Sequence, residues 1–242
     1  MRVVTSSLRQ GAQAARGVAV IVDVYRAFSC TALLFSLGAE AVILMGSPEE
    51  AFAYRKQNPR ALLVGEVRGR PIPGFDLPNS PSEILRMEEG FFLGRKIVQR
   101  TSSGVQGALL ALDGSDVIFL GSYLNARATA RAVQALGAEL VHIVAMGREM
   151  LERTPEDEWC ARYLACLLGS GTYDHLEALR QILRSPETGK FLEGGSPHYP
   201  AADPLICLQR DILDLALAAR REGDLAVVRA QQPAAGSPPR GA

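Results

Sequence analysis

The amino-acid sequence predicts an α/β fold with three layers, α/β/α, around a largely parallel or mixed sheet. Two observations predict it. Short apolar runs rich in β-branched residues alternate along the chain with longer segments of helical period. Most of the short runs are apolar at consecutive positions, as in VAVIV at 18–22, which is typical of strands covered by helices on both faces.

The individual elements follow from these patterns in chain order. The expected strands cover residues 2–6, 18–24, 41–45, 61–66, 96–100, 116–122, 140–147 and 225–230. The expected helices lie near 28–38, 48–57, 81–87, 104–112, 123–136, 155–168, 174–184 and 203–221. Start signals support two of these helices, because Ser47 and Thr154 each precede a proline and a group of acidic residues.

Length and composition fit one globular domain over residues 1–230, followed by a low-complexity tail at 231–242 that we expect to be disordered. Lys+Arg and Asp+Glu both number 26, so no net charge favours nucleic acid or a membrane surface as a partner. The four cysteines form no CxxC pair, which is typical of reduced thiols in the cytoplasm. A homo-oligomer is compatible with this composition.

Polar motifs follow five of the expected strands at the point where each strand ends. They are DVYRAFSC (23–30), GEVRG (65–69), RTSSG (100–104), GSYLNA (121–126) and MGRE (146–149). Ligands of open α/β sheets bind at the carboxyl ends of the strands. We therefore expect these loops to build one pocket.

Two of the loops have the parts of an anion site. Arg100 is followed by hydroxyl residues and by Gly104 at the start of a helix, and Arg26 is followed by Ser29 and Thr31. Serines before a helix also serve as simple caps, and that interpretation stays open for each loop taken alone. With Arg68 and Arg70 close by in the chain, the pattern favours a small ligand with more than one anionic group.

Acidic residues accompany the anion sites. Asp23 and Glu66 each end an apolar strand, Asp76 lies in a loop rich in proline and glycine, and Glu156 and Asp157 begin a helix. A single acid of this kind is more often a cap or a solvated charge. Oxygen ligands next to an anion site nevertheless suit Mg²⁺ bridging protein and phosphate.

Several enzyme classes are excluded by spacing. No cysteine begins a CxxxxxR loop, no histidine stands between arginine and glycine, and Tyr25 occupies the second acidic position of a DxD motif. The GxGxxG, GxxxxGK[ST] and GxSxG motifs are absent, and the three histidines are isolated in the sequence.

Five motifs, in order, resemble those of the magnesium-dependent 2-phosphosulfolactate phosphatases of coenzyme M biosynthesis. The family patterns are DVxRA, GE…G…GFDxGNSP, TTxNGT, GSxxNA and a late helix containing ED. This chain has DVYRAFSCT, GEVRGRPIPGFDLPNSP, RTSSGVQG, GSYLNA and TPEDEWCA. The resemblance spans most of residues 18–165 and, more loosely, 211–230. The chain departs from the family at Val67, where arginine is usual, and at Pro78, Ser103 and Val105.

The resemblance implies a family-specific α/β/α topology and a phosphatase that hydrolyses the ester of a small, anionic, phosphorylated 2-hydroxy acid, with Mg²⁺ as cofactor. It implies Asp23, Arg26, Glu66 and Asp76 as catalytic residues and Asp23, Glu66, Asp76, Glu156 and Asp157 as metal ligands. The substrate contacts would come from Ser29, Cys30, Thr31, Arg68, Arg70, Asn79, Ser80, Arg100, Thr101, Ser102, Ser103, Gly104, Gly121, Ser122 and Asn125.

Three alternatives remain open at this point. The substrate could be a different phosphorylated hydroxy acid, or the chain could bind an anionic metabolite without turning it over. The attack on phosphorus could come from a water molecule or from Asp23 itself. Cys30 lies inside the proposed phosphate loop, and we interpret it as a small residue near a helix start rather than a nucleophile.

Overall fold

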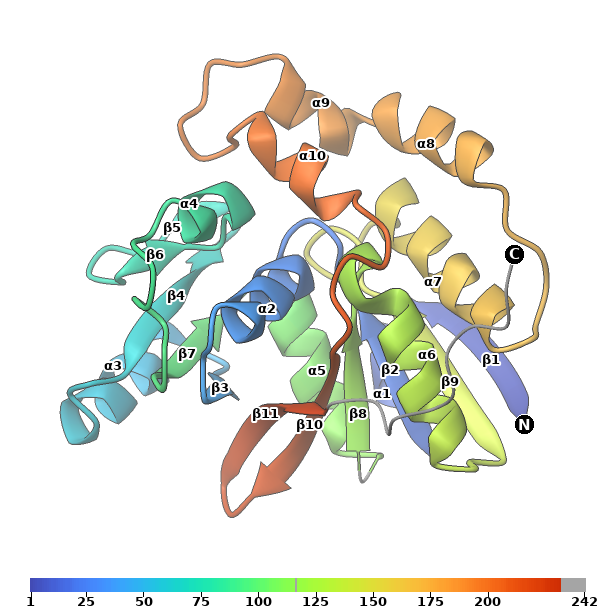
Figure 1. The fold of residues 1–242 in the computed structure, drawn as a ribbon, viewed down its shortest axis with the longest axis horizontal. Helices are drawn as coiled ribbons and strands as arrows, with labels where there is room; N and C mark the ends of the chain where they lie inside the picture. The colour runs from blue at the N-terminus through green and yellow to red at the C-terminus, as the bar shows by residue number, and fades with distance from the viewer. Residues whose placement is uncertain (116, 232–242) are drawn as a thin grey trace.

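The structure is a computed structural model that describes residues 1–115 and 117–231. These residues form one mixed sheet of 11 strands in the order β1-β9-β2-β8-β10-β11-β3-β7-β4-β5, with β6 paired to β4 (Figure 1). Helices pack on both faces of this sheet, so the predicted α/β class with a mixed sheet is confirmed.

The sheet consists of two parallel blocks joined by an antiparallel hairpin. The first block contains β1 (Arg2–Ser7), β9 (Leu140–Ala145), β2 (Val18–Val22) and β8 (Val117–Gly121). The second block contains β3 (Ala41–Leu44), β7 (Lys96–Arg100) and β4 (Leu62–Val67), with the short β5 (Arg70–Pro71) and β6 (Leu77–Pro78) at its edge. The hairpin of β10 (Ala216–Glu222) and β11 (Leu225–Gln231) pairs with β8 on one side and β3 on the other.

The helices follow the strands along the chain. They are α1 (Leu8–Ala14), α2 (Ala27–Ser36), α3 (Pro48–Gln57), α4 (Pro81–Leu85), α5 (Gly104–Leu112), the 3₁₀ turn η1 (Tyr123–Asn125), α6 (Ala126–Ala135), α7 (Pro155–Leu167), α8 (His175–Leu183), α9 (Pro186–Leu192) and α10 (Ala202–Cys207). Figure 1 shows α8, α9 and α10 following one another above the rest of the molecule.

Strand β2 shows how the layers form. Val18, Val20 and Val22 pack into one core with residues of α6 and α7, whereas Ala19 and Ile21 pack into a second core with residues of α2 and α5. Successive side chains of a strand point to opposite faces, so a run that is apolar throughout needs a helical layer on each side.

The second core is shared by the two blocks of the sheet. Val42, Val64 and Ile97 of the second block belong to it, while Leu63 and Val98 face α3 on the opposite side. Because both blocks of the sheet contribute to one core that also contains residues of α2 and α5, the sheet curves around these two helices. Figure 1 shows β4 and β8 steeply inclined to each other, as the accumulated twist of a wide sheet allows.

The helix predicted over residues 203–221 is wrong in its second half. Helix α10 ends at Cys207, and residues 216–222 form strand β10, in which Leu217 pairs with Leu120 of β8. The segment LALAAR has high helix propensity, but β8 and β11 provide backbone partners on both sides, and this tertiary pairing outweighs local preference. Helices α1 and α9 were not predicted.

The remaining sequence predictions concern the chain ends and membranes. Residue 116, the first of a predicted strand, and residues 232–242 of the predicted tail lie outside the described residues, while Gln231 ends β11. No helix in residues 1–115 and 117–231 combines the length and the apolar character that crossing a membrane requires.

Candidate active site

A pocket of about 310 Å³ lies between the two blocks of the sheet and the α9–α10 region. Loops that follow β2, β4, β7 and β9 all contribute to it, as four of the five polar motifs predicted, whereas the loop after β8 with GSYLNA does not line it. The predicted site residues that line it are Asp23, Arg26, Glu66, Arg68, Asn79, Thr101, Ser102 and Ser103.

Asp23 occupies the first position after β2 and is almost fully buried. Its backbone N–H donates to the carbonyl of Gly121 on the neighbouring strand, and its Oδ1 accepts the N–H of Ala27 at 3.0 Å. Burial raises the pKa of the Asp23 carboxyl to about 7, and the nearby negative charge of Glu66 acts in the same direction. The negative charge of an ionised Asp23 is therefore only partly compensated by the hydrogen bonds and charges around it.

Gly104 explains how the loop after β7 comes so close to Asp23. A Cβ atom at position 104 would lie 2.6 Å from Oδ2 of Asp23 and 2.9 Å from the Cβ of Ala27. Only glycine lets the start of α5 approach the carboxylate at this distance. Thr101 and Ser103 flank this approach: Thr101 Oγ1 accepts the N–H of Val105, and Ser103 Oγ donates to the carbonyl of Gly147.

Glu66 organises the loops around it with both of its carboxylate oxygens. Oε1 accepts the N–H of Ser102 at 2.5 Å, and Oε2 accepts the N–H of Gly69 at 2.6 Å and the hydroxyl of Ser102 at 3.1 Å. Arg100 lies outside the pocket lining and supports the same loops, because its Nη1 donates to the carbonyl of Glu66 and to Ser102 Oγ. These contacts fix the position of the Ser102 backbone against β4.

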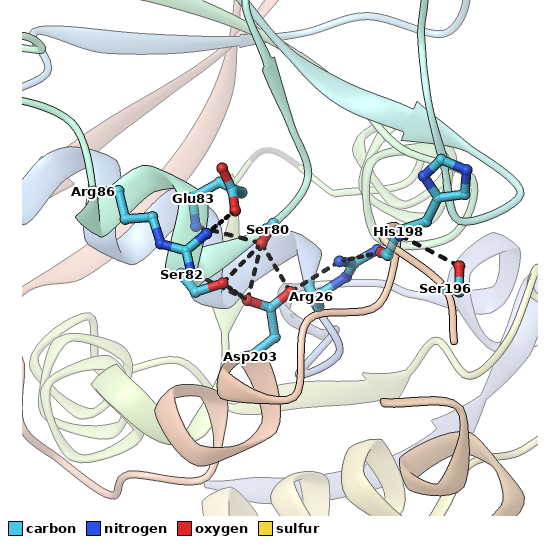
Figure 2. Close-up of polar contacts among 8 residues, drawn as sticks. All are labelled: Arg26, Ser80, Ser82, Glu83, Arg86, Ser196, His198 and Asp203. Carbon is cyan, nitrogen blue, oxygen red and sulfur yellow. Dashed lines mark hydrogen bonds and ion pairs between the residues drawn. The ribbon is translucent and has the colours of Figure 1, made fainter. Parts of the chain in front are cut away.

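Arg26 is the buried cation of the pocket. Its Nη1 donates to Asp203 Oδ2 at 2.9 Å and to the carbonyl of His198 at 3.0 Å (Figure 2). The rings of Phe191 and Tyr199 lie 5.3 and 5.4 Å from its guanidinium carbon, within the range of a cation–π interaction.

Arg68 and Asn79 complete the set of predicted residues in the lining. The Arg68 side chain is exposed, and its Nε lies 3.7 Å from Glu149 Oε2. Asn79 is 4% exposed, and its Oδ1 has no hydrogen-bond partner among the described residues. A buried amide oxygen without a partner next to a pocket is suited to a ligand or water.

Other lining residues were not among the predicted site residues, although the motif MGRE had placed the loop that contains Arg148 and Glu149 at the pocket. They come from the loop after β9 and from residues 187–199: Arg148, Glu149, Leu151, Glu152, Glu187, Lys190, Phe191 and Tyr199. Lys190 Nζ contacts both oxygens of Glu187 at 2.6 and 2.8 Å, and Arg148 pairs with Glu152. The motif MGRE pointed to Arg148, but residues 187–199 carry no local signal that would have identified them.

Asp76 does not face the pocket, which corrects its predicted role as a ligand beside Glu66. Its oxygens accept two hydrogen bonds from Arg55 of α3, at 2.8 and 2.6 Å, and one from the N–H of Leu63 at 2.7 Å. Arg70 is also outside the lining and exposed on the surface. The loop 65–81 is therefore held by α3 and β4, with Asp76 as the attachment point.

The hydroxyls predicted at the start of α2 point into the protein. Ser29 Oγ donates to the carbonyl of Val24, and Thr31 Oγ1 donates to the carbonyl of Ala27 and to Gln99. Cys30 is fully buried, and burial raises the pKa of its thiol well above the usual range. None of these three side chains lines the pocket.

The predicted contacts from GSYLNA and from Ser80 are likewise internal. Asn125 Oδ1 accepts the N–H of Ser122, and its Nδ2 donates to the carbonyl of Leu120, which closes the turn after Gly121. Ser80 Oγ donates to Asp203. These residues shape the loops and do not line the pocket.

Glu156 and Asp157 are buried at the start of α7 and do not line the pocket. Asp157 accepts the N–H of Val24 at 2.7 Å and the N–H of Gly147 at 2.8 Å, so it ties together the loops after β2 and β9. Burial raises the pKa of Glu156 to about 8 and the pKa of Asp157 well above its usual range.

The oxygen ligands that line the pocket indicate whether the predicted Mg²⁺ fits this site. Asp23 and Glu66 place carboxylates in the lining, with the hydroxyls of Thr101 and Ser102 in the same wall. Among the described residues, no three His, Cys, Asp or Glu side chains are grouped to hold an ion by themselves. Mg²⁺ commonly takes one or two carboxylates and completes its shell with water and substrate phosphate. The residues fit an ion shared in this way.

The comparisons with known proteins agree with the resemblance of the motifs. The family model for 2-phosphosulpholactate phosphatase matches residues 3–217. A probable 2-phosphosulfolactate phosphatase of Bacillus subtilis is 30% identical over 212 residues, covering 86% of this chain and 90% of the relative. A 2-phosphosulfolactate phosphatase of Methanocaldococcus jannaschii is 36% identical over 121 residues, covering 48% of this chain and 50% of the relative. This chain belongs to the 2-phosphosulfolactate phosphatase family.

Proposed function

We propose that this protein is a Mg²⁺-dependent phosphatase that hydrolyses 2-phosphosulfolactate to sulfolactate and phosphate. The observation that carries the proposal is that the buried carboxylates of Asp23 and Glu66 line the same pocket as Arg26, Arg68 and the hydroxyl residues 101–103. Its volume of about 310 Å³ suits a small ligand.

The residues divide into two groups by the part of the substrate they meet. Arg26 and the hydroxyl of Thr101 bind the phosphate, because a buried guanidinium and a hydroxyl whose proton is not already donated stabilise its charge. Arg68 is exposed at the pocket and binds a second anionic group of the substrate, either the carboxylate or the sulfonate.

Asp23 and Glu66 hold the metal in this proposal. A bound Mg²⁺ would neutralise phosphate charge and favour an oxygen nucleophile. The buried, negatively charged Asp23 is destabilised in the metal-free protein, and a cation relieves that cost. Glu66 keeps the loops in place at the same time through its three hydrogen bonds.

The test is a phosphate-release assay over phosphorylated 2-hydroxy acids, with 2-phosphosulfolactate, phospholactate and a simple aryl phosphate as the first three substrates. We expect release with Mg²⁺, loss of release in EDTA, and recovery when Mg²⁺ is restored. Full activity in EDTA from protein that contains no metal would contradict the metal dependence.

The same assay separates the alternatives to this substrate. If phospholactate or another phosphorylated hydroxy acid has a higher kcat/KM than 2-phosphosulfolactate, the chain is a phosphatase for that ester. If it binds these compounds and leaves all of them intact in the presence of Mg²⁺, it is a binding module.

A further inference from the structure

The orientation of Arg26 depends on a segment that is distant in sequence. Its hydrogen bonds go to Asp203 and to the carbonyl of His198, and its guanidinium lies against the rings of Phe191 and Tyr199. All four contacts come from residues 191–203. In Figure 2 the Arg26 side chain points toward Asp203 and the loop that carries His198.

Asp203 holds a second part of the site with the same carboxylate. Its Oδ1 accepts the N–H of Ser82 at 2.9 Å and the hydroxyl of Ser82 at 2.6 Å, and both of its oxygens lie 2.9 Å from Ser80 Oγ (Figure 2). Ser80 directly follows Asn79, whose unpartnered Oδ1 lies beside the pocket. One side chain therefore anchors both Arg26 and the turn that presents Asn79.

Burial makes this arrangement rigid. Asp203 is 0% exposed and does not line the pocket, and Arg26 is 5% exposed. A buried carboxylate needs its charge partner and several hydrogen bonds, and this one has both. The guanidinium has five N–H groups, and Asp203 and His198 engage only Nη1, which leaves donors for an anion in the pocket.

We propose that Asp203 is a positioning residue for phosphate binding: it orients Arg26 and the Asn79 turn without touching the substrate. Residues 191–203 thereby complete a phosphate site whose other parts lie in the first half of the chain. This inference rests on the proposed role of Arg26 as a phosphate ligand.

The test compares Asp203→Asn, Arg26→Ala and the double variant in the presence of Mg²⁺. The measurements are KM and kcat for 2-phosphosulfolactate and an aryl phosphate, and the Kd of inorganic phosphate. Asp203→Asn keeps the shape of the side chain but removes its charge, so we expect KM and the phosphate Kd to rise about tenfold. The loss of phosphate affinity in the double variant should be smaller than the sum of the two single losses, because Asp203 acts mainly through Arg26 and only in part through the Asn79 turn.

KM and Kd separate positioning from stability. A variant that is only less stable loses active protein, which lowers apparent kcat and leaves KM and Kd unchanged. Ser80→Ala is a second variant, since it removes the hydroxyl that contacts both oxygens of Asp203 and caps α4 through the N–H of Glu83, and it keeps the ion pair of Asp203 with Arg26. We expect it to raise the phosphate Kd about threefold.

Asp174→Asn is the matched control. It is the same chemical change in the C-terminal helical segment, at a residue that caps α8 and lies outside the pocket lining. It should leave KM and the phosphate Kd unchanged.

Three results would overturn the proposal. The first is an Asp203→Asn variant with wild-type KM and phosphate Kd, and the second is a double variant in which the two losses add. The third is a wild-type protein that does not bind phosphate. If the wild type releases phosphate from no ester, the proposed function fails, but the phosphate Kd values of the same variants still decide whether Asp203 positions Arg26.

Discussion

At the scale of single residues, Arg68 and Arg70 of the loop 65–81 differ in their surroundings, although the sequence predicted the same role for both. Arg68 has a left-handed backbone with φ of 51°, an uncommon conformation for a residue other than glycine, and its N–H donates to Ser102 Oγ. This turn directs Arg68 to the pocket. Arg70 lies in β5 and is absent from the lining of the pocket; it borders a second surface hollow with Pro71 and Ile72, which Arg68 also lines.

The two arginines therefore form a matched pair for a substitution experiment. We expect Arg68→Ala to lower kcat/KM about tenfold on a phosphorylated hydroxy acid, because one charge-assisted contact to the second anionic group is lost. An aryl phosphate has no second anion and should show little change. Arg70→Ala should resemble wild type on both substrates. Equal losses in the two variants would mean that the pocket does not distinguish Arg68 from Arg70.

At the scale of elements, the same loop is a scaffold fixed at its two ends. Glu66 holds the loop to Ser102 and Gly69, and Asp76 holds it to Arg55 of α3 and to the backbone of Leu63. Of the two carboxylates that hold this loop, only that of Glu66 lines the pocket.

This arrangement predicts that Asp76 contributes to stability and not to metal binding. Asp76→Asn weakens a partly exposed ion pair, and we expect a loss of about 1 kcal/mol, equivalent to a Tm lower by about 3 °C. The Mg²⁺ concentration that gives half-maximal activity should not change. Asp23→Asn is the comparison, and it should abolish activation by Mg²⁺. A shift of the Mg²⁺ requirement in Asp76→Asn would restore the ligand role that the sequence suggested.

The helices and strands of the site also differ in whether their role could be predicted from the sequence. The positions of Asp23, Glu66 and Thr101 were predictable because each lies at the end of a short apolar strand, and that pattern is local. Asp203 was not predictable as a site residue, because its partners Arg26 and Ser80 are 177 and 123 positions away in the chain. Strand β10 was missed for the same reason, since its pairing with β8 depends on residues that are distant in sequence.

At the scale of the whole molecule, the curved sheet concentrates buried acids near its centre. Asp157 ties the loops after β2 and β9 together, Asp23 directly follows β2, and Glu156 is next to Asp157 on α7. All three carboxyls are buried, and burial raises the pKa of each. Glu156 Oε2 has no hydrogen-bond partner among the described residues. This group of acids couples the stability of the fold to pH.

The direction of that coupling follows from the pKa values. In the folded protein the pKa of Glu156 is raised from 4.5 to about 8 and that of Asp23 from 3.8 to about 7. The folded state binds these protons more tightly than the unfolded chain does. The stability that the two groups contribute is therefore complete below about pH 4 and is lost as pH rises through 7 and 8.

We expect the Tm of the metal-free protein, measured in EDTA, to fall as pH increases from 5 to 9. Glu156→Gln stays neutral at every pH, so its Tm should match wild type near pH 5 and exceed it by about 3 °C or more at pH 9. The exposed Glu89→Gln is the control and should follow the wild-type curve. The measurement is the Tm from thermal melts at five pH values. If the curves of Tm against pH are parallel for wild type and Glu156→Gln, the protonation of Glu156 is not linked to folding. Added Mg²⁺ should flatten the wild-type curve, because a cation at Asp23 stabilises the ionised carboxylate that high pH creates.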